Sequence, residues 1–317
     1  MSWRRGVGLG LCVGLVGVNF LAAMHARAFL FFGPPGERSS SVESISVVEA
    51  ASVLVLGPSL PRPENRTDPH AALGRSFASS EHVTADGETL ALWTLEPRRT
   101  ARGTVVLLHG YGGSRDQLLD VADFFLAQGY RTVLPDQRAA GDSTGAYTTL
   151  GYKEAEDLAG LAVSLRQTHT GPLVVYGFSM GAVAALGAVG REGAPVDAVI
   201  AEAPYGSLVD TVGQRFRLLG LPPTPGSELL LVWGSVWTGF WAFDLRPVED
   251  AAHISVPTLV ISGAHDRRAP PADGAAIAAR LMGPSEHLVL PETGHQVGLW
   301  TRPVEWGRAV KQVLSRL

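Results

Sequence analysis

One serine stands between two glycines at a point where the residue pattern changes from strand to helix. Residues 174–186, VVYGFSMGAVAAL, run from an apolar stretch through Gly-Phe-Ser-Met-Gly into an Ala-rich stretch of helical character. Gly-x-Ser-x-Gly between a buried strand and a helix is typical of a sharp turn that exposes a nucleophilic serine. The N–H groups and dipole of the following helix favour negative charge there. The sequence therefore predicts Ser179 as a nucleophile.

A serine hydroxyl becomes a good nucleophile only when a base takes its proton. Asp266 ends the apolar stretch LVISGAHD, and His295 ends the later segment PETGH. The chain order serine, acid, histidine is the one found with this type of turn. We expect His295 to accept the proton of Ser179 and pass it to the leaving group, while Asp266 fixes the imidazole tautomer.

The sequence also contains competitors for these two roles. His265 stands beside the proposed acid and is the nearest alternative base. Glu202 is the strongest alternative acid, because it ends the preceding predicted strand, VIAEAP. Asp273 and Asp244 are further carboxylates, which we expect on a helix and in an insertion, respectively.

A tetrahedral oxyanion would need hydrogen-bond donors close to the serine. We expect one from the backbone N–H of Met180 and one from that of Tyr111, in the loop HGYGG. Removing one such donor typically slows catalysis by about 100- to 1,000-fold. The side chains of Tyr111 and Tyr205 are expected either to line an acyl pocket or to pack in the core.

Strand and helix patterns alternate from residue 76 onward, which predicts an α/β fold with a mainly parallel sheet and helices on both faces. Reactive groups in such sheets gather at the carboxyl ends of the strands. The predicted elements are a hairpin at 81–97, strands at 103–110, 130–136, 171–178, 196–204, 256–266 and 285–295, and helices at 114–129, 149–168, 179–191, 271–283 and 305–317.

A long apolar interval at about 206–255 interrupts this alternation. Its aromatic residues predict a helical cap over the site, with Trp233, Trp237, Phe240 and Trp241 lining a substrate pocket. The alternative is an ordinary pair of packing helices.

The N-terminus has the pattern of a membrane-directed segment. Arg4 and Arg5 precede an uncharged apolar stretch at 6–24, close to the length that spans a bilayer. We expect residues 1–33 to form a transmembrane signal-anchor, with a cleaved signal peptide as the alternative. Residues 34–75 would be a tether, and 76–317 a catalytic domain held outside the cytoplasmic membrane.

Composition excludes several other functions. The net charge of −4 gives no basis for nucleic-acid binding. One cysteine, Cys12, allows neither an intramolecular disulfide nor a cysteine-rich metal site. The histidines lack the spacing of zinc enzymes, and no Gly-x-Gly-x-x-Gly follows a predicted strand. We therefore expect neither a cofactor nor a metal.

The segments HGYGGSRDQ, PDQRAAGDSTG, GFSMG, SGAHDRRAP and TGH occur in the order of the strand-end motifs of the α/β-hydrolase superfamily. The chain resembles this superfamily over 76–317, and is most similar to its membrane-anchored branch near lysophospholipases, monoacylglycerol lipases and serine-aminopeptidase-like enzymes. The resemblance implies the α/β-hydrolase fold, and implies that Asp136 and Arg138 organise a loop rather than react.

The expected activity is hydrolysis of a small or lipid-like carboxylic ester through an acyl-enzyme. A serine aminopeptidase-like peptidase and a thioesterase are the alternatives, because one fold serves many substrates. A non-catalytic binding protein on a hydrolase frame is a further alternative. It is disfavoured because all three triad residues are present.

Overall fold

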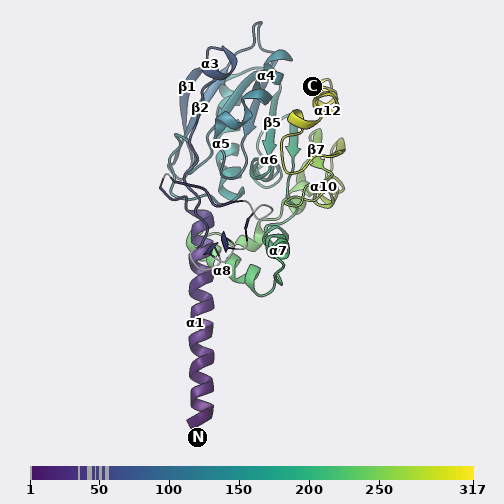
Figure 1. Ribbon diagram of the computed structural model, residues 1–317. Coiled ribbons are helices and arrows are strands. Elements are labelled where there is room, and N and C mark those ends of the chain that lie inside the picture. The colour runs from purple at the N-terminus through teal and green to yellow at the C-terminus, as the bar shows by residue number, and fades with distance from the viewer. Residues whose placement is uncertain (1, 35, 41–44, 47, 50–51, 54–56) are drawn as a thin grey trace.

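The computed structural model describes residues 2–34, 36–40, 45–46, 48–49, 52–53 and 57–317, with side chains from residue 14 onward. Within this part of the chain, eight strands form one sheet of order β1-β2-β4-β3-β5-β6-β7-β8 (Figure 1). β1 pairs antiparallel with β2, and β2 with β4, while the remaining pairs are parallel. The strands are β1 (Ala78–Val83), β2 (Thr89–Leu95), β3 (Thr104–Leu108), β4 (Arg131–Pro135), β5 (Leu173–Phe178), β6 (Ala198–Glu202), β7 (Thr258–Gly263) and β8 (Ser285–Leu290). The predicted α/β-hydrolase architecture is confirmed.

Each face of the sheet carries its own apolar core, because successive side chains of a strand point to opposite faces. In β3, Val105 and Leu107 join the core beneath one layer of helices, and Val106 and Leu108 join the core beneath the other. The first layer contains α4 (Leu119–Ala127) and α12 (Pro303–Leu314), and the second contains α5 (Tyr152–Thr168), α6 (Met180–Gly190) and α10 (Pro271–Ala278). The central strands are buried on both faces, as their continuous apolar runs predict.

The helix expected at 114–129 begins as a 3-10 turn, η1 (Arg115–Leu118), before α4 starts. Ser114 precedes it without a side-chain capping bond to the helix, because its hydroxyl is engaged by Asp116 Oδ1 and the Glu64 carbonyl. The remaining short helices are α3 (Pro69–Leu73), η2 (Ala242–Asp244), α9 (Pro247–Asp250), η3 (Ala251–His253) and α11 (Gly298–Thr301).

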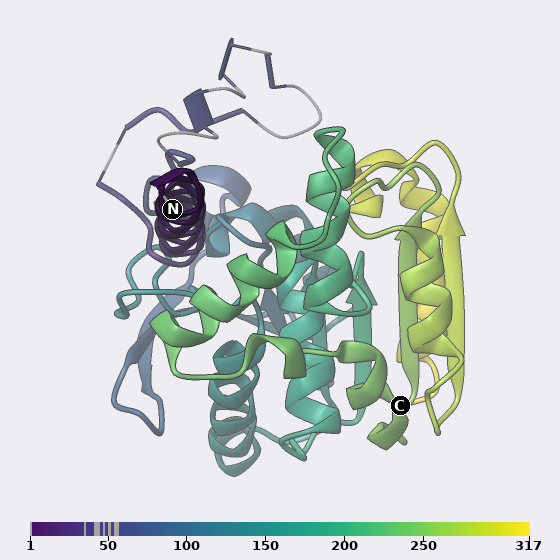
Figure 2. The ribbon, with the colours of Figure 1, turned by 90° about the horizontal axis from the view of Figure 1, so that it is seen from below.

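The interval between β6 and β7 forms two cap helices, α7 (Leu208–Leu218) and α8 (Gly226–Thr238). Figure 2 shows them lying across the end of the domain from which α1 (Ser2–Leu30) projects. Ser207 caps α7 by accepting a hydrogen bond from the backbone N–H of Asp210. The helical nature of the insertion agrees with the expectation from sequence.

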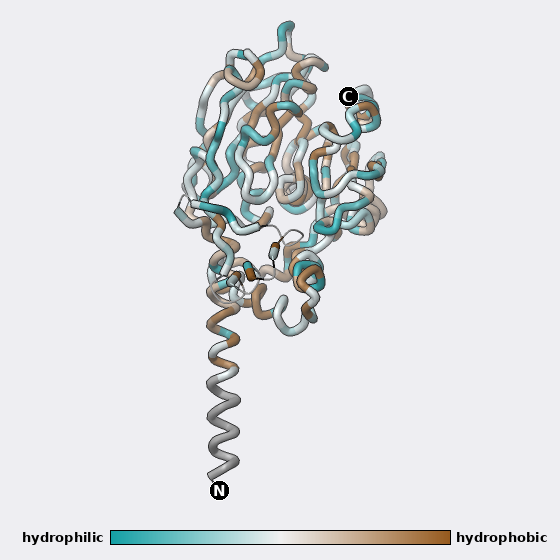
Figure 3. Tube along the Cα trace, in the orientation of Figure 1, coloured by the Kyte–Doolittle hydropathy of each residue, from teal (hydrophilic) through white to brown (hydrophobic). Residues whose placement is uncertain are grey.

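α1 extends away from the domain on the side of the cap, and its last turns lie against α8 (Figure 1). Figure 3 shows hydrophobic (brown) stretches along its described part. Leu15, Val16 and Phe20 are exposed apolar residues of this helix. No helix among the residues with described side chains is long and apolar enough to cross a membrane. The apolar stretch at 6–24 begins in the part of α1 whose side chains lie outside the described residues. The described residues thus do not support the predicted anchor.

Candidate active site

Ser179 occupies a strained turn between β5 and α6. Its φ and ψ angles are 54° and −113°, outside the regions that non-glycine residues favour. A Cβ at Gly177 would lie 2.2 Å from the Gly181 carbonyl oxygen, and one at Gly181 would lie 2.3 Å from the Leu108 carbonyl oxygen. Both glycines are therefore required sterically. The turn is held by a hydrogen bond of 2.8 Å from the Ser179 N–H to the Glu202 carbonyl.

The structure brings Ser179, His295 and Asp266 together in one hydrogen-bonded chain. Ser179 Oγ lies 2.9 Å from His295 Nε2, and His295 Nδ1 lies 2.7 Å from Asp266 Oδ2. The other carboxylate oxygen of Asp266 accepts the backbone N–H groups of Arg268 (2.8 Å) and Ala269 (2.9 Å). The Asp266 side chain is fully buried, and that of His295 is 16% exposed. This arrangement lets the imidazole take the serine proton while the carboxylate stabilises its charge.

The alternative acid, Glu202, serves a different purpose. It is buried, and its carboxylate accepts hydrogen bonds from Tyr176 Oη (2.5 Å), Trp306 Nε1 (2.9 Å) and the backbone N–H of Gly298. Burial raises the pKa of the Glu202 carboxyl. Gly298 lies three residues after His295. Its hydrogen bond to Glu202, the last residue of β6, therefore joins the loop that carries His295 to the sheet.

The other competitors also lie apart from the triad contacts. His265 is exposed, and its backbone N–H donates to the Thr293 carbonyl. Asp244 is exposed in η2. Asp273 lies in the first turn of α10, and burial raises the pKa of its carboxyl.

The loop after β3 carries the expected oxyanion donor Tyr111, and the side chain of His109 holds it through hydrogen bonds. The buried His109 accepts the Gln137 N–H at Nε2 (3.0 Å), so Nδ1 carries the proton and donates to the Gly110 carbonyl (2.9 Å). Burial lowers the pKa of His109, in keeping with this neutral form. Met180, the other expected donor, is the first residue of α6.

Asp136 and Arg138 organise the loop between β4 and α5, as the resemblance implies. The fully buried Asp136 accepts the backbone N–H groups of Arg115 (2.7 Å) and Asp142 (2.9 Å). Arg138 donates two hydrogen bonds to Asp157, at 2.6 and 2.7 Å.

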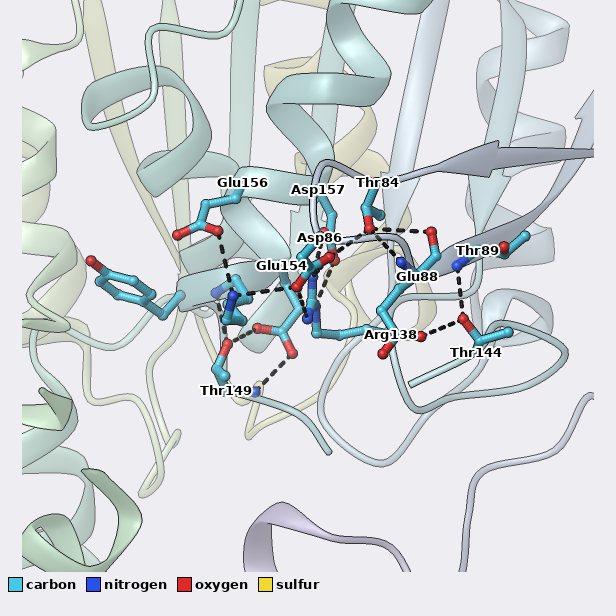
Figure 4. Close-up of polar contacts among 12 residues, drawn as sticks. Thr84, Asp86, Glu88, Thr89, Arg138, Thr144, Thr149, Glu154, Glu156 and Asp157 are labelled. Atoms are coloured by element: carbon cyan, nitrogen blue, oxygen red, sulfur yellow. Dashed lines mark hydrogen bonds and ion pairs between the residues drawn. The ribbon is translucent and has the colours of Figure 1, made fainter. Parts of the chain in front are cut away.

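Arg138 also joins the hairpin turn to this loop through Asp86 (Figure 4). The Arg138 hydrogen bond holds the pKa of the Asp86 carboxyl well below its usual range. In the same region, Glu154 accepts the hydroxyls of Thr148 and Thr149, both at 2.6 Å. These hydrogen bonds join the loop to the hairpin turn and to α5, and none of them reaches Ser179 or His295.

A cavity of about 820 Å³ opens above the triad, toward the larger end of the range for ligand pockets. Ser179, His295, Met180, Tyr111 and Tyr205 all line it. Cap residues supply much of the rest, including Leu208, Val212, Phe216, Leu219, Leu230, Leu231 and Phe240.

Four aromatic residues were predicted to line the pocket. Of these, Phe240 lines the cavity, whereas Trp233, Trp237 and Trp241 do not. Trp237 lies on the side of α8 that faces α1, where its indole N–H donates to the Ala23 carbonyl (3.1 Å). Trp241 is exposed and stacks on Phe243. The sequence prediction failed here because composition locates an aromatic cluster without determining which side of the helix faces inward.

Residues from before the predicted domain also line the cavity, and none of them was predicted from the sequence. Phe29 and Leu30 end α1, and Arg38 and Leu60 belong to the segment assigned as a tether. No local motif distinguishes these residues. They reach the cavity only because the N-terminal segment folds back against the domain on the side of the cap.

Comparisons with known proteins agree with this architecture. A family model described as "Serine aminopeptidase, S33" matches residues 99–224. The chain is 27% identical over 208 residues to the uncharacterized protein YqkD of Bacillus subtilis, covering 63% of this chain and 66% of YqkD. It is also 27% identical over 217 residues to the uncharacterized protein Rv2307c of Mycobacterium tuberculosis, covering 67% of this chain and 70% of that protein. The chain thus spans about two thirds of the length of these relatives.

Solved structures of esterases share the fold. The Pyrococcus furiosus esterase Pf2001 superposes with a TM-score of 0.66 at 26% identity, covering 81% of this chain and 98% of that one. A thermophilic esterase from Thermogutta terrifontis gives a TM-score of 0.55 at 20% identity, covering 75% and 98%. With its eight-stranded sheet and its strained serine turn after β5, the chain belongs to the α/β-hydrolase superfamily.

Proposed function

We propose that this protein is a serine esterase that cleaves a lipid-like carboxylic ester through an acyl-enzyme. The observation that carries the proposal is the hydrogen-bonded chain Ser179–His295–Asp266, whose first two members line the cavity. The esterase structures with the same fold support ester chemistry.

The proposed reaction uses these side chains in the following order. Ser179 Oγ forms a bond to the acyl carbon as its proton passes to His295 Nε2, and the carbonyl oxygen becomes an oxyanion near the N–H groups of Met180 and Tyr111. Collapse of this intermediate breaks the ester bond, and the imidazolium gives its proton to the departing alkoxide. Water, deprotonated by His295, then releases the acyl group as a carboxylic acid and restores the serine.

The lining of the cavity favours an acyl chain over a peptide. An aminopeptidase needs a carboxylate near the scissile bond to bind the substrate ammonium group. Of the lining residues that the structure describes, none is Asp or Glu, and most are apolar. The family model named for a serine aminopeptidase nevertheless keeps a peptidase as the second candidate. A thioesterase would use the same three residues in the same steps.

We further propose that α1 holds the protein at a membrane, with the catalytic domain outside the cytoplasm. Arg4 and Arg5 before the apolar stretch at 6–24 support this topology. α1 extends from the cap side of the domain (Figure 1), so its insertion would bring the cavity close to the bilayer. A lipid-like substrate would then have a short path to Ser179.

Hydrolysis rates on p-nitrophenyl esters of graded chain length, measured beside aminoacyl-p-nitroanilides, test the proposed activity. We expect turnover of the esters, loss of that turnover in Ser179→Ala, and no significant turnover of the anilides. Preferential cleavage of the anilides would establish the peptidase instead. Undiminished ester hydrolysis by Ser179→Ala would reject the nucleophile assignment.

A further inference from the structure

The end of α1 and the segment after it reach the same cavity as the triad. Eleven of the described residues from this region line it together with Ser179 and His295. Four of them are used below, and we call these the N-terminal wall: Phe29, Leu30, Arg38 and Leu60. Leu30 is buried, and its carbonyl accepts the Thr148 N–H at 3.0 Å. The wall is therefore bonded to the hydrolase domain.

Two hydrogen bonds join the N-terminal wall to the loop that carries the expected oxyanion donor. The Tyr111 hydroxyl donates to the Phe29 carbonyl at 2.6 Å, and Arg38 Nη1 donates to the Gly112 carbonyl at 2.8 Å. The ring of Phe32 also lies against that of Tyr111, with centroids 5.6 Å apart. The N-terminal region thus contacts the loop at two successive residues.

Phe29 combines apolar character with accessible surface at this point. Its side chain lines the cavity and is still 38% exposed, so part of the ring is free to contact a ligand. Cap residues such as Leu231 and Phe240 line the same cavity and are also apolar. An extended acyl chain leaving Ser179 would therefore have apolar surface available both from the cap and from Phe29.

We propose that the N-terminal wall is part of the substrate site, with Phe29 contacting the distal part of a long acyl chain and Arg38 positioning the oxyanion loop. This inference rests on the proposed esterase function and specifies its substrate as a long-chain acyl ester. On this proposal, a short acyl group would not reach Phe29, whereas both short and long substrates would depend on the loop that Arg38 contacts.

The test compares Phe29→Ala with Phe20→Ala in the full chain held in amphipol. Phe20 is a matched control, because it lies in the same helix, is 64% exposed and does not line the cavity. The assay is kcat/KM on p-nitrophenyl palmitate and p-nitrophenyl acetate. We expect Phe29→Ala to lower the palmitate-to-acetate ratio by about tenfold, as loss of a buried apolar contact predicts. Phe20→Ala should leave this ratio unchanged.

A ratio in Phe29→Ala within about twofold of the wild type, or an equal fall in Phe20→Ala, would overturn the assignment. Phe29→Leu keeps an apolar side chain, so a partial effect is expected even if the alanine variant folds poorly. Arg38→Gln should lower kcat for both esters with little change in KM. The substitution would disturb the loop at Tyr111 and Gly112 but not the contact between Phe29 and the acyl chain. Equal kcat in Arg38→Gln and wild type would refute its positioning role.

Binding of cis-parinaric acid, a fluorescent long-chain fatty acid, separates this proposal from the proposed activity. Ser179→Ala should still bind it, whereas Phe29→Ala should bind about tenfold more weakly. If the wild type bound the fatty acid more tightly than Phe29→Ala but hydrolysed no ester, the proposed esterase activity would be wrong, and the role of the N-terminal wall in acyl-chain binding would still be supported. Equal binding by Phe29→Ala and wild type would reject the wall whether or not the esters were hydrolysed.

Discussion

Replacing Asp266 by Asn tests the triad through the direction of one hydrogen bond. Asp266 Oδ1 accepts the backbone N–H groups of Arg268 and Ala269, while Oδ2 faces His295 Nδ1 at 2.7 Å. In Asp266→Asn the single amide oxygen is needed by the two backbone donors, so the NH₂ group must face the imidazole. It would donate to Nδ1 and leave the ring proton on Nε2, which then cannot accept the proton of Ser179.

The expected effect is a fall in kcat of about 10⁴-fold, or ~5.5 kcal/mol of transition-state stabilisation. The backbone hydrogen bonds of residue 266 are retained, so the melting temperature should change little. Turnover of p-nitrophenyl butyrate, corrected for active sites and measured beside thermal unfolding, gives both quantities.

Glu202→Gln is the matched control, because it neutralises the other buried carboxylate that sequence analysis left as a candidate acid. The glutamine oxygen can still accept the Gly298 N–H, but its NH₂ group cannot accept from Trp306 or Tyr176. Unfolding should become easier by about 1–3 kcal/mol, with kcat lowered by less than about tenfold. A loss of turnover in Glu202→Gln equal to that in Asp266→Asn would refute the assignment of the acid.

Three further outcomes are expected. Ser179→Ala should lose labelling by a fluorophosphonate probe while keeping its far-ultraviolet circular dichroism; a labelled variant would refute the nucleophile. Gly181→Ala should destabilise the fold by about 3 kcal/mol or more, measured by urea unfolding, because its Cβ would lie 2.3 Å from the Leu108 carbonyl oxygen. Gly160→Ala, whose Cβ would make only an ordinary contact with His82, is its control, and equal stability of the two would contradict the steric argument. Burial raises the pKa of the Glu202 carboxyl, so its contribution to stability is greatest at low pH and is lost as pH rises above about 4.5. We expect the free energy of unfolding of the wild type, measured by urea titration, to fall relative to that of Glu202→Gln as the pH rises above about 4.5. The same pH dependence in both proteins would contradict this linkage.

The central strands and the serine turn could be predicted because their signals are local. The runs at β3 and β5 are continuously apolar, as burial on both faces requires. The glycines on either side of Ser179 are required because a Cβ at either position would collide with backbone. Chain order alone placed Asp266 and His295 at the ends of successive strand segments.

The preference for Asp266 over Glu202 required the tertiary structure, because Glu202 ends β6 and Asp266 closely follows the end of the neighbouring β7. The sequence does not show that Tyr176 and Trp306 surround Glu202, or that His295 faces Asp266. The aromatic residues of α8 posed a similar problem, since α1 packs on the side that carries Trp237.

The sequence by itself determined the layered α/β fold and the sharp turn at Ser179, and it predicted Ser179 as a nucleophile, because periodicity and steric requirements act within a few residues. Only the tertiary structure decided what encloses the site. Residues 34–75 have the composition of a tether, yet Arg38 and Leu60 line the cavity with Phe29. Such contacts join residues far apart in the chain, and their free energy depends on a spatial arrangement that no local pattern encodes.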